Sequence, residues 1–138
     1  MTVTNQNFKV YRADTHVVHV DLTHADGTPF DPSINVQMRW RMTRNPADED
    51  DAVIRKALLG EEGGITKTAT GVDIALNGWD TDVPLGCYAH YLIVNDPPDV
   101  NTAMTGYAVI QRTARMGTGK SVLQGNLAIS KTPPTRVP

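Results

Sequence analysis

The stretch Ile34-Asn-Val-Gln-Met-Arg-Trp-Arg-Met42 alternates apolar and polar residues without a break, and it decides the fold class. Successive side chains of a β-strand point to opposite faces, so this alternation predicts a strand with one face in the core. Trp40 belongs to the apolar set and is expected to be buried. Arg39 and Arg41 belong to the polar set and are expected to form a cationic outer face.

Shorter alternating or apolar runs predict further strands, and turn residues separate most of them. The predicted strands are residues 8–12, 17–22, 53–58, 65–68, 72–76, 87–94, 105–113 and 122–130. Residues 24–31 contain Asp26-Gly27 and Pro29, which is typical of a hairpin connection. A helical period is weak throughout, and Gly60 closely follows its best candidate, residues 52–59.

This pattern predicts an all-β fold, namely an antiparallel β-sandwich of the immunoglobulin-like or jelly-roll type with short helical turns at most. The chain has 138 residues, enough for one domain with its own core. We expect residues 1–130 to form this single sandwich domain. Residues 131–138, which contain Pro133-Pro134, are expected to form an extended C-terminal arm.

The composition argues against several classes of protein. No apolar run is long enough to span a membrane, and residues 1–10 lack the charged start and apolar stretch of a signal peptide. Cys87 is the single cysteine and cannot form an internal disulfide, so we expect a small buried side chain there. The net charge of −2 favours neither nucleic acid nor a membrane surface as a partner.

Charge is distributed unevenly along the chain. Residues 1–100 carry 8 basic and 15 acidic side chains, a balance of −7, whereas residues 101–138 carry 5 basic side chains and no acidic one. This split predicts docking onto partner proteins through charged segments. The candidate docking residues are Asp48, Glu49, Asp50 and Asp51 in an acidic loop, Arg39 and Arg41 on the predicted strand, and Lys131 and Arg136 in the arm.

No motif predicts a catalytic, cofactor or metal site. Gly117-Thr-Gly-Lys-Ser121 resembles the end of a phosphate-binding loop, but Ala114 stands where its first glycine belongs, and too little chain follows for a nucleotide-binding fold. A loop between strands is the favoured interpretation. His16 and His19 lie three residues apart on a predicted strand and therefore point to opposite faces, so they cannot share a metal. Enzymatic activity is unsupported by the residues.

One local pattern is more specific. Gly86-Cys-Tyr88 precedes an alternating strand, and a tyrosine at this place resembles the tyrosine corner of immunoglobulin-like sandwiches. In such a corner the phenol donates a hydrogen bond to the backbone of the preceding loop. Tyr88, with Gly86 before it, is therefore predicted to be a structural corner.

Short turn and strand motifs follow one another in a fixed order along residues 12–130. They are Arg12-Ala-Asp-Thr15, Asp26-Gly-Thr-Pro-Phe-Asp31, Arg39-Trp-Arg41, Gly63-Gly-Ile65, Val72-Asp-Ile-Ala-Leu76, Asp80-Thr81, Pro84-Leu-Gly-Cys-Tyr88 and Gln124-Gly-Asn-Leu-Ala-Ile129. This order resembles small bacteriophage virion proteins, and it is similar to the N-terminal domain of phage baseplate upper proteins. That family usually begins with Arg-Gly-Asp-Thr and has Pro-Gly-X-Tyr. This chain departs from it at Ala13 and at the inserted Leu85.

The resemblance implies a virion protein that catalyses nothing, needs no cofactor and binds other virion proteins, as a homo-oligomer within the particle. It would be made in the host cytoplasm. A tail, baseplate or fibre-attachment component is favoured by the resemblance, and a capsid decoration or cementing protein is the alternative suggested by the small size. A third hypothesis is a carbohydrate-binding module for host attachment, for which Trp79 is the candidate aromatic platform.

Overall fold

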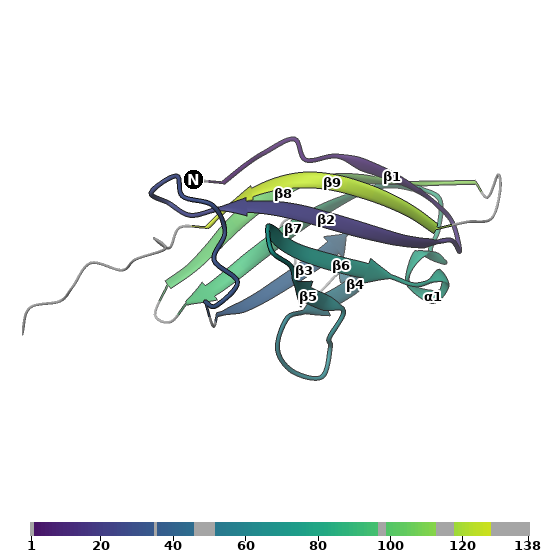
Figure 1. The fold of residues 1–138 in the computed structure, drawn as a ribbon. Coiled ribbons are helices and arrows are strands. Elements are labelled where there is room, and N and C mark those ends of the chain that lie inside the picture. The colour runs from purple at the N-terminus through teal and green to yellow at the C-terminus, as the bar shows by residue number, and fades with distance from the viewer. Residues whose placement is uncertain (1, 35, 46–51, 97–98, 113–117, 128–138) are drawn as a thin grey trace, which may run out of the picture.

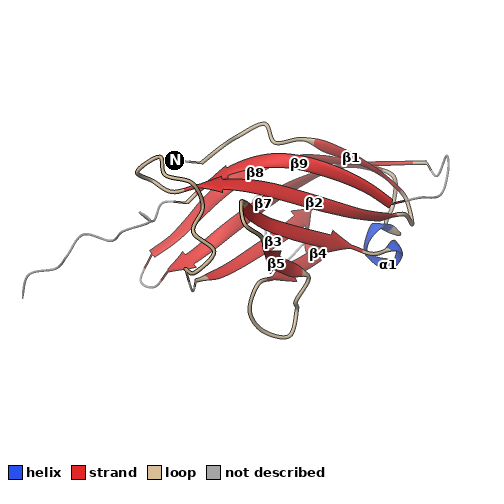
Figure 2. Cartoon of the chain, in the orientation of Figure 1, coloured by secondary structure: helices blue, strands red, loops and turns tan. Residues whose placement is uncertain are grey.

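The computed structural model describes residues 2–34, 36–45, 52–96, 99–112 and 118–127 (Figure 1). These residues form strands and one helical turn (Figure 2). The elements are β1 (Phe8–Tyr11), β2 (Thr15–Thr23), β3 (Gln37–Thr43), β4 (Ala52–Ala57), β5 (Ile65–Lys67), β6 (Gly71–Leu76), α1 (Gly78–Thr81), β7 (Gly86–Asp96), β8 (Asp99–Gln111) and β9 (Thr118–Asn126). The predicted all-β class is confirmed.

The strands form two sheets, one with the order β1-β8-β7-β3-β4 and the other with the order β5-β6-β2-β9. The buried side chains of both sheets belong to one hydrophobic cluster. Trp40 of β3, Ile74 of β6 and Met104 of β8 have no exposed surface in it. The prediction that Trp40 points into the core is therefore correct.

The predicted antiparallel sandwich is not confirmed, because both sheets are mixed. β1 pairs with β8 in parallel, and β2 pairs with β9 in parallel, whereas the other ladders are antiparallel. A parallel pair needs a long connection between its strands. Most of the chain lies between β1 and β8 and between β2 and β9, so this requirement is met. Local alternation carries no information about such distant partners.

The segment 24–31 is also not a hairpin connection, because it joins β2 of one sheet to β3 of the other. Its shape depends on His24, which has no exposed surface and whose Nε2 accepts a hydrogen bond of 3.0 Å from the backbone nitrogen of Asp31. Phe30 stacks on the same ring, with the ring centroids 6.1 Å apart. The segment thus crosses between the sheets and places Phe30 in the core.

Two strands begin earlier than predicted. β8 begins at Asp99 rather than at residue 105, and β9 begins at Thr118 rather than at residue 122. Residues 118–121 of the glycine-rich motif are consequently part of a strand and not of a loop. Polar residues are tolerated there because one face of each strand meets solvent.

The N-terminal segment closes one margin between the sheets. The backbone nitrogen of Gln6 donates to the carbonyl of Thr105 in β8 at 3.0 Å, and its side-chain Oε1 accepts from the backbone nitrogen of Gln124 in β9 at 2.7 Å. A Cβ atom on Gly106 would lie 2.0 Å from the Gln6 carbonyl oxygen. Glycine is therefore needed for the segment to approach β8 so closely.

The opposite margin is closed between β4 and β5. A bridge joins Ala57 to Gly64, and the Gly64 carbonyl also accepts from the backbone nitrogen of Ala75 in β6 at 2.8 Å. The two sheets are thus linked by hydrogen bonds on both sides of the core. Such links cover sheet edges that would otherwise offer free backbone groups to other chains.

We predict that Trp40→Ala lowers the free energy of unfolding by about 3–5 kcal/mol, the usual cost of deleting a large buried side chain. Chemical denaturation monitored by circular dichroism measures this change. Val122→Ala is a matched control on an exposed side chain (58% exposed) and should change stability little. A loss below about 1 kcal/mol for Trp40→Ala would contradict its place in the core.

Candidate functional site

One end of the molecule is organised around the single turn α1. The side chain of Asn77 accepts a hydrogen bond from the backbone nitrogen of Asp80, and the Asp80 carboxylate accepts from the backbone nitrogen of Asn77. This reciprocal pair is a capping box, which satisfies two backbone donors that a short helix leaves open. Asp80 also accepts from Nζ of Lys56 in β4 at 2.7 Å. This contact therefore holds α1, which follows β6 of one sheet, to β4 of the other sheet.

The turn between β1 and β2 packs against α1. Thr81 is fully buried, and its hydroxyl donates to the carbonyl of Asp14 at 2.7 Å. Arg12 forms an ion pair of 2.9 Å with Asp82. Ala13, at the tip of the turn, has a φ of 65°, a left-handed conformation that non-glycine residues rarely adopt. Side-chain and backbone contacts thus hold a strained turn in place.

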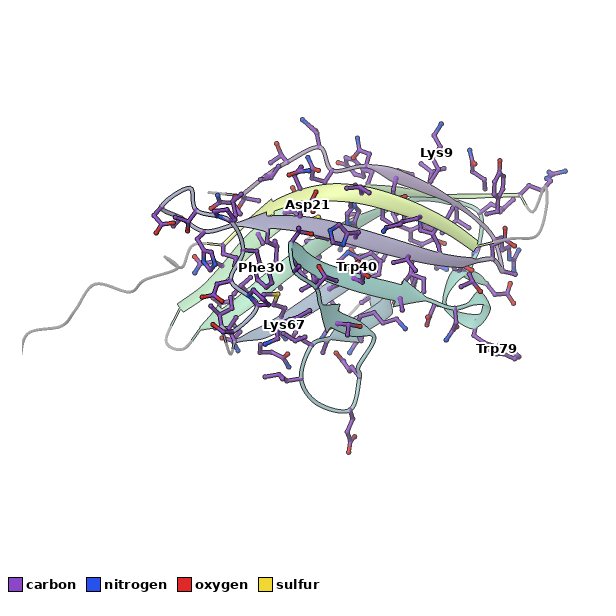
Figure 3. The ribbon with its side chains drawn as sticks, in the orientation of Figure 1. Lys9, Asp21, Phe30, Trp40, Lys67 and Trp79 are labelled. Carbon is purple, nitrogen blue, oxygen red and sulfur yellow. The ribbon has the colours of Figure 1, made fainter. Side chains whose placement is uncertain are left out.

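Trp79 projects from this framework into solvent (Figure 3). The side chain of Thr81 faces inward, and Trp79, two residues earlier on the same turn, is 88% exposed. Leu85, four residues after α1, is also 46% exposed. A large indole is held on a fixed support, and in the described residues the chain provides nothing to cover it.

Tyr88 fixes the loop that follows α1. Its phenol donates a hydrogen bond of 2.6 Å to the backbone carbonyl of Pro84, and the residue is 3% exposed. Gly86, between them, has a φ of 147°, which L side chains rarely adopt. A bond from a phenol to the backbone of the preceding loop is the kind of contact that a tyrosine corner makes.

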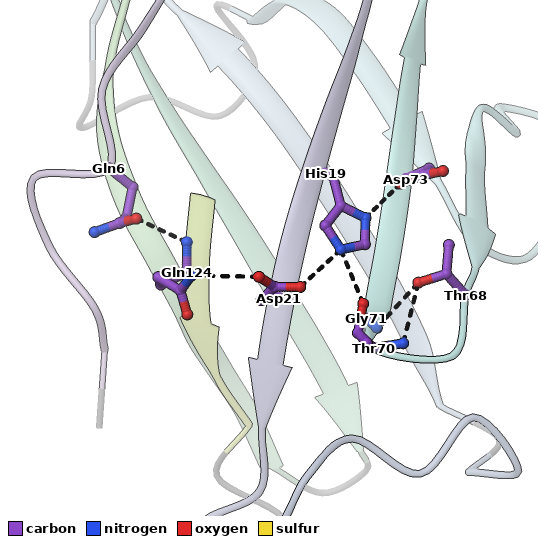
Figure 4. A network of polar contacts seen from close by, with 8 residues as sticks. All are labelled: Gln6, His19, Asp21, Thr68, Thr70, Gly71, Asp73 and Gln124. Carbon is purple, nitrogen blue, oxygen red and sulfur yellow. Dashed lines mark hydrogen bonds and ion pairs between the residues drawn. The ribbon is translucent and has the colours of Figure 1, made fainter. Parts of the chain in front are cut away.

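A polar network lies on the outer face of the sheet formed by β5, β6, β2 and β9 (Figure 4). Nδ1 of His19 lies 2.5 Å from Asp73, and its Nε2 lies 2.8 Å from Asp21 and 3.0 Å from the hydroxyl of Thr70. Burial raises the pKa of Asp21, but hydrogen bonds from His19, Thr70 and Gln124 outweigh it and lower that pKa overall. The network joins three strands across the face.

His16 and His19 lie on opposite faces of β2, as their spacing predicts. His16 points inward, where it stacks on Phe8 with the ring centroids 5.7 Å apart, and its Nε2 lies 2.8 Å from the hydroxyl of Ser121. Burial lowers the pKa of His16. Within the described residues, no group of three or more histidine, cysteine or acidic side chains is arranged to hold a metal.

His90 is a buried titratable group beside Trp40 in the core. Its Nδ1 accepts from Nε1 of Trp40 at 3.1 Å, and its Nε2 donates to the backbone carbonyl of Gln6 at 2.6 Å. The neutral ring satisfies both contacts, because it has one acceptor and one donor nitrogen. Burial lowers the pKa of His90 to about 4, although the bond to Gln6 acts in the opposite direction.

Arg41 does not belong to an exposed cationic face, and that prediction is wrong. The residue is 4% exposed, and its guanidinium donates to the carbonyls of Trp40 and Lys56 and pairs with Glu62 at 3.0 Å. The loop that follows β4 brings Glu62 over the guanidinium and covers it. Arg39 is half-buried on the same strand.

The remaining charged docking candidates, Asp48, Glu49, Asp50, Asp51, Lys131 and Arg136, lie outside the described residues, as does the predicted arm 131–138. Cys87 is exposed, and the expectation of a buried thiol is wrong. Tyr88 takes the inward position at the start of β7, so its neighbour Cys87 points outward. In the part of the chain that is described, no helix is long and apolar enough to cross a membrane.

Comparison with known proteins finds no relative of this chain. No family model, no curated protein and no solved structure matches the chain.

Replacing Ala13 with glycine should raise the free energy of unfolding by about 1 kcal/mol, because glycine adopts the left-handed conformation without the steric cost of a Cβ atom. Urea denaturation of wild type and Ala13→Gly measures the difference. Ala75→Gly serves as the control, since it places glycine at an exposed position of a regular strand and should destabilise. Destabilisation by Ala13→Gly would contradict the left-handed turn.

The protein should lose stability between pH 6.5 and pH 4. The pKa of His90 is 6.5 ordinarily and about 4 in the folded chain, so the unfolded chain binds more protons in this window. The free energy of unfolding therefore falls as the pH falls, by about 3 kcal/mol over the whole window from His90, and His16 acts in the same direction. Titration of the His90 ring protons by NMR measures the pKa of this residue directly. A midpoint near pH 6.5 would contradict the lowered pKa.

Proposed function

We propose that this chain is a non-enzymatic structural subunit of a bacteriophage particle, which docks onto other virion proteins in the tail or baseplate. The observation that carries the docking role is Trp79, which is 88% exposed on a turn held by the Asn77–Asp80 capping box and the Lys56–Asp80 ion pair. Tryptophan is enriched at the centres of protein interfaces, where it supplies a large contact area. A rigid support lowers the entropy cost of using it.

The geometry of two turns supports the resemblance to phage virion proteins. That family usually has glycine where this chain has Ala13, and the φ of 65° at this position explains why glycine would be preferred there. The bond from Tyr88 to the carbonyl of Pro84 supports the finer assignment of an immunoglobulin-like sandwich, in which such a corner links the two sheets. Both turns belong to the ordered series of motifs on which the resemblance to phage virion proteins depends.

A second candidate function is binding of cell-surface saccharides through Trp79. The same exposure favours it, because an uncovered indole face can stack against a sugar ring. The ion pair between Arg12 and Asp82 lies beside the same turn and is partly exposed, so it places polar groups at that end of the molecule. The two candidate functions imply different partners, namely virion proteins and cell-surface saccharides, and therefore need different experiments.

We predict that Trp79→Ala abolishes or strongly reduces incorporation of the subunit into phage particles while changing the free energy of unfolding by less than about 0.5 kcal/mol, as is usual for exposed positions. Particles assembled with each variant are purified and the subunit is quantified by mass spectrometry. Trp79→Phe keeps an aromatic contact and should be incorporated partly. Val122→Ala changes an exposed apolar side chain elsewhere and should be incorporated normally.

Copy number in the wild-type particles then decides the placement. A few dozen copies or fewer would support the tail or baseplate, and hundreds would support a capsid decoration protein instead. Absence of the chain from purified particles would overturn the virion proposal. Binding of glycans by the isolated protein that is lost in Trp79→Ala would favour the second candidate.

A further inference from the structure

The N-terminal segment contains one residue more than the strand beside it. Val3 is paired with Met104 and Phe8 with Ala108, so the segment advances five residues while β8 advances four. The extra residue is accommodated near Asn5, whose φ of 60° is left-handed. Asparagine tolerates this conformation better than most residues. The segment is therefore bulged at Asn5, and bulges often shape the backbone around a binding site.

A hollow of about 280 Å³ lies beside this bulge. It is lined by Thr4, Asn5, Ala89, His90, Tyr91, Thr105, Gly106 and Tyr107. Ala89 is paired with Tyr107, and Tyr91 is paired with Thr105, so the two tyrosines are diagonal neighbours on β7 and β8. Diagonal neighbours on paired strands are about 7–8 Å apart, and both tyrosines line the hollow. Ala89 and Gly106 add little bulk between them.

The lining is neutral and rich in hydrogen-bonding groups. None of the eight residues carries a formal charge, because both ring nitrogens of His90 are engaged by Trp40 and Gln6. The side chains of Thr4, Asn5 and Thr105 make no hydrogen bond to another described residue and can bind a ligand. Tyr107 is 55% exposed, so one side of its ring is accessible.

We propose that this hollow binds one unit of a neutral saccharide. A neutral lining offers no attraction to phosphate, carboxylate or ammonium groups, which argues against nucleotides and charged peptides. An amide and two hydroxyls match the hydroxyl groups of a sugar, and tyrosine rings match its apolar C–H face. The volume lies just below the range of about 300–1,000 Å³ that is usual for small-molecule sites, which suits a ligand as small as one sugar ring.

The proposal is independent of the virion assignment and of Trp79, because the hollow is lined by β7, β8 and the N-terminal segment and by no residue of α1. We suggest a titration of the isotope-labelled full chain with glucose, galactose, mannose and N-acetylglucosamine, followed by ¹H–¹⁵N NMR. Saturable shifts are expected at the amides of residues 4–5 and 105–107, for at least one sugar, with a Kd on the order of 1 mM for so small a ligand. Glycerol at the same hydroxyl concentration is the control for non-specific effects.

Two variants make the test specific. Tyr107→Ala removes an exposed ring and should weaken binding by about tenfold, whereas Tyr107→Phe keeps the ring and should weaken it less. Asn5→Gly keeps the left-handed conformation but removes the amide, and should also weaken binding. Val122→Ala changes an exposed apolar side chain that does not line the hollow, and it should bind as the wild type does. Shifts that do not saturate, shifts confined to residues 78–85, or unchanged binding by Tyr107→Ala would each overturn the proposal.

Discussion

The fold depends on the two hydrogen bonds that His90 makes in the core. The ring accepts from Trp40 of β3 and donates to the backbone of Gln6, while its own strand, β7, lies between β3 and β8. Burying an imidazole without hydrogen-bond partners would lower the stability of the folded protein. The folded state therefore needs both hydrogen bonds of His90. The ring therefore fixes the orientation of the largest core side chain and the path of the N-terminal segment at once. Gly106 is required because the segment then passes directly over β8.

The position of the N-terminal segment determines how the two sheets are joined. Gln6 contacts β8 through its backbone and β9 through its side chain, and the Gly64 backbone joins the sheets at the opposite margin. The Lys56–Asp80 pair adds a link between β4 and α1. With both margins closed, the sheets cannot easily shear or open at an edge. The surfaces left for binding are the outer faces of the sheets and the ends of the molecule.

Local alternation was enough to predict the class and the core face of β3, because period-two patterning depends only on one buried side. It could not predict the parallel pairing of β2 with β9, since register across distant strands depends on tertiary packing. The prediction that Arg41 belongs to an exposed cationic face failed for a similar reason. The sequence identifies an outward position, but only the fold brings Glu62 and two carbonyls onto the guanidinium. The hollow was missed because a single extra residue near Asn5 leaves no compositional signal.

The hydrogen bonds and ion pairs described above also distinguish polar side chains that stabilise the fold from side chains that are available for binding. His19, His90 and Arg41 are of residue types that are often found in active sites, yet each makes polar contacts to neighbours in the chain that stabilise the fold. Trp79 and Tyr107 are different, because they expose large aromatic surfaces on backbone that is already fixed. Pre-organised aromatic groups lose little entropy on binding. Recognition by this protein is therefore expected to depend on aromatic contact more than on charge.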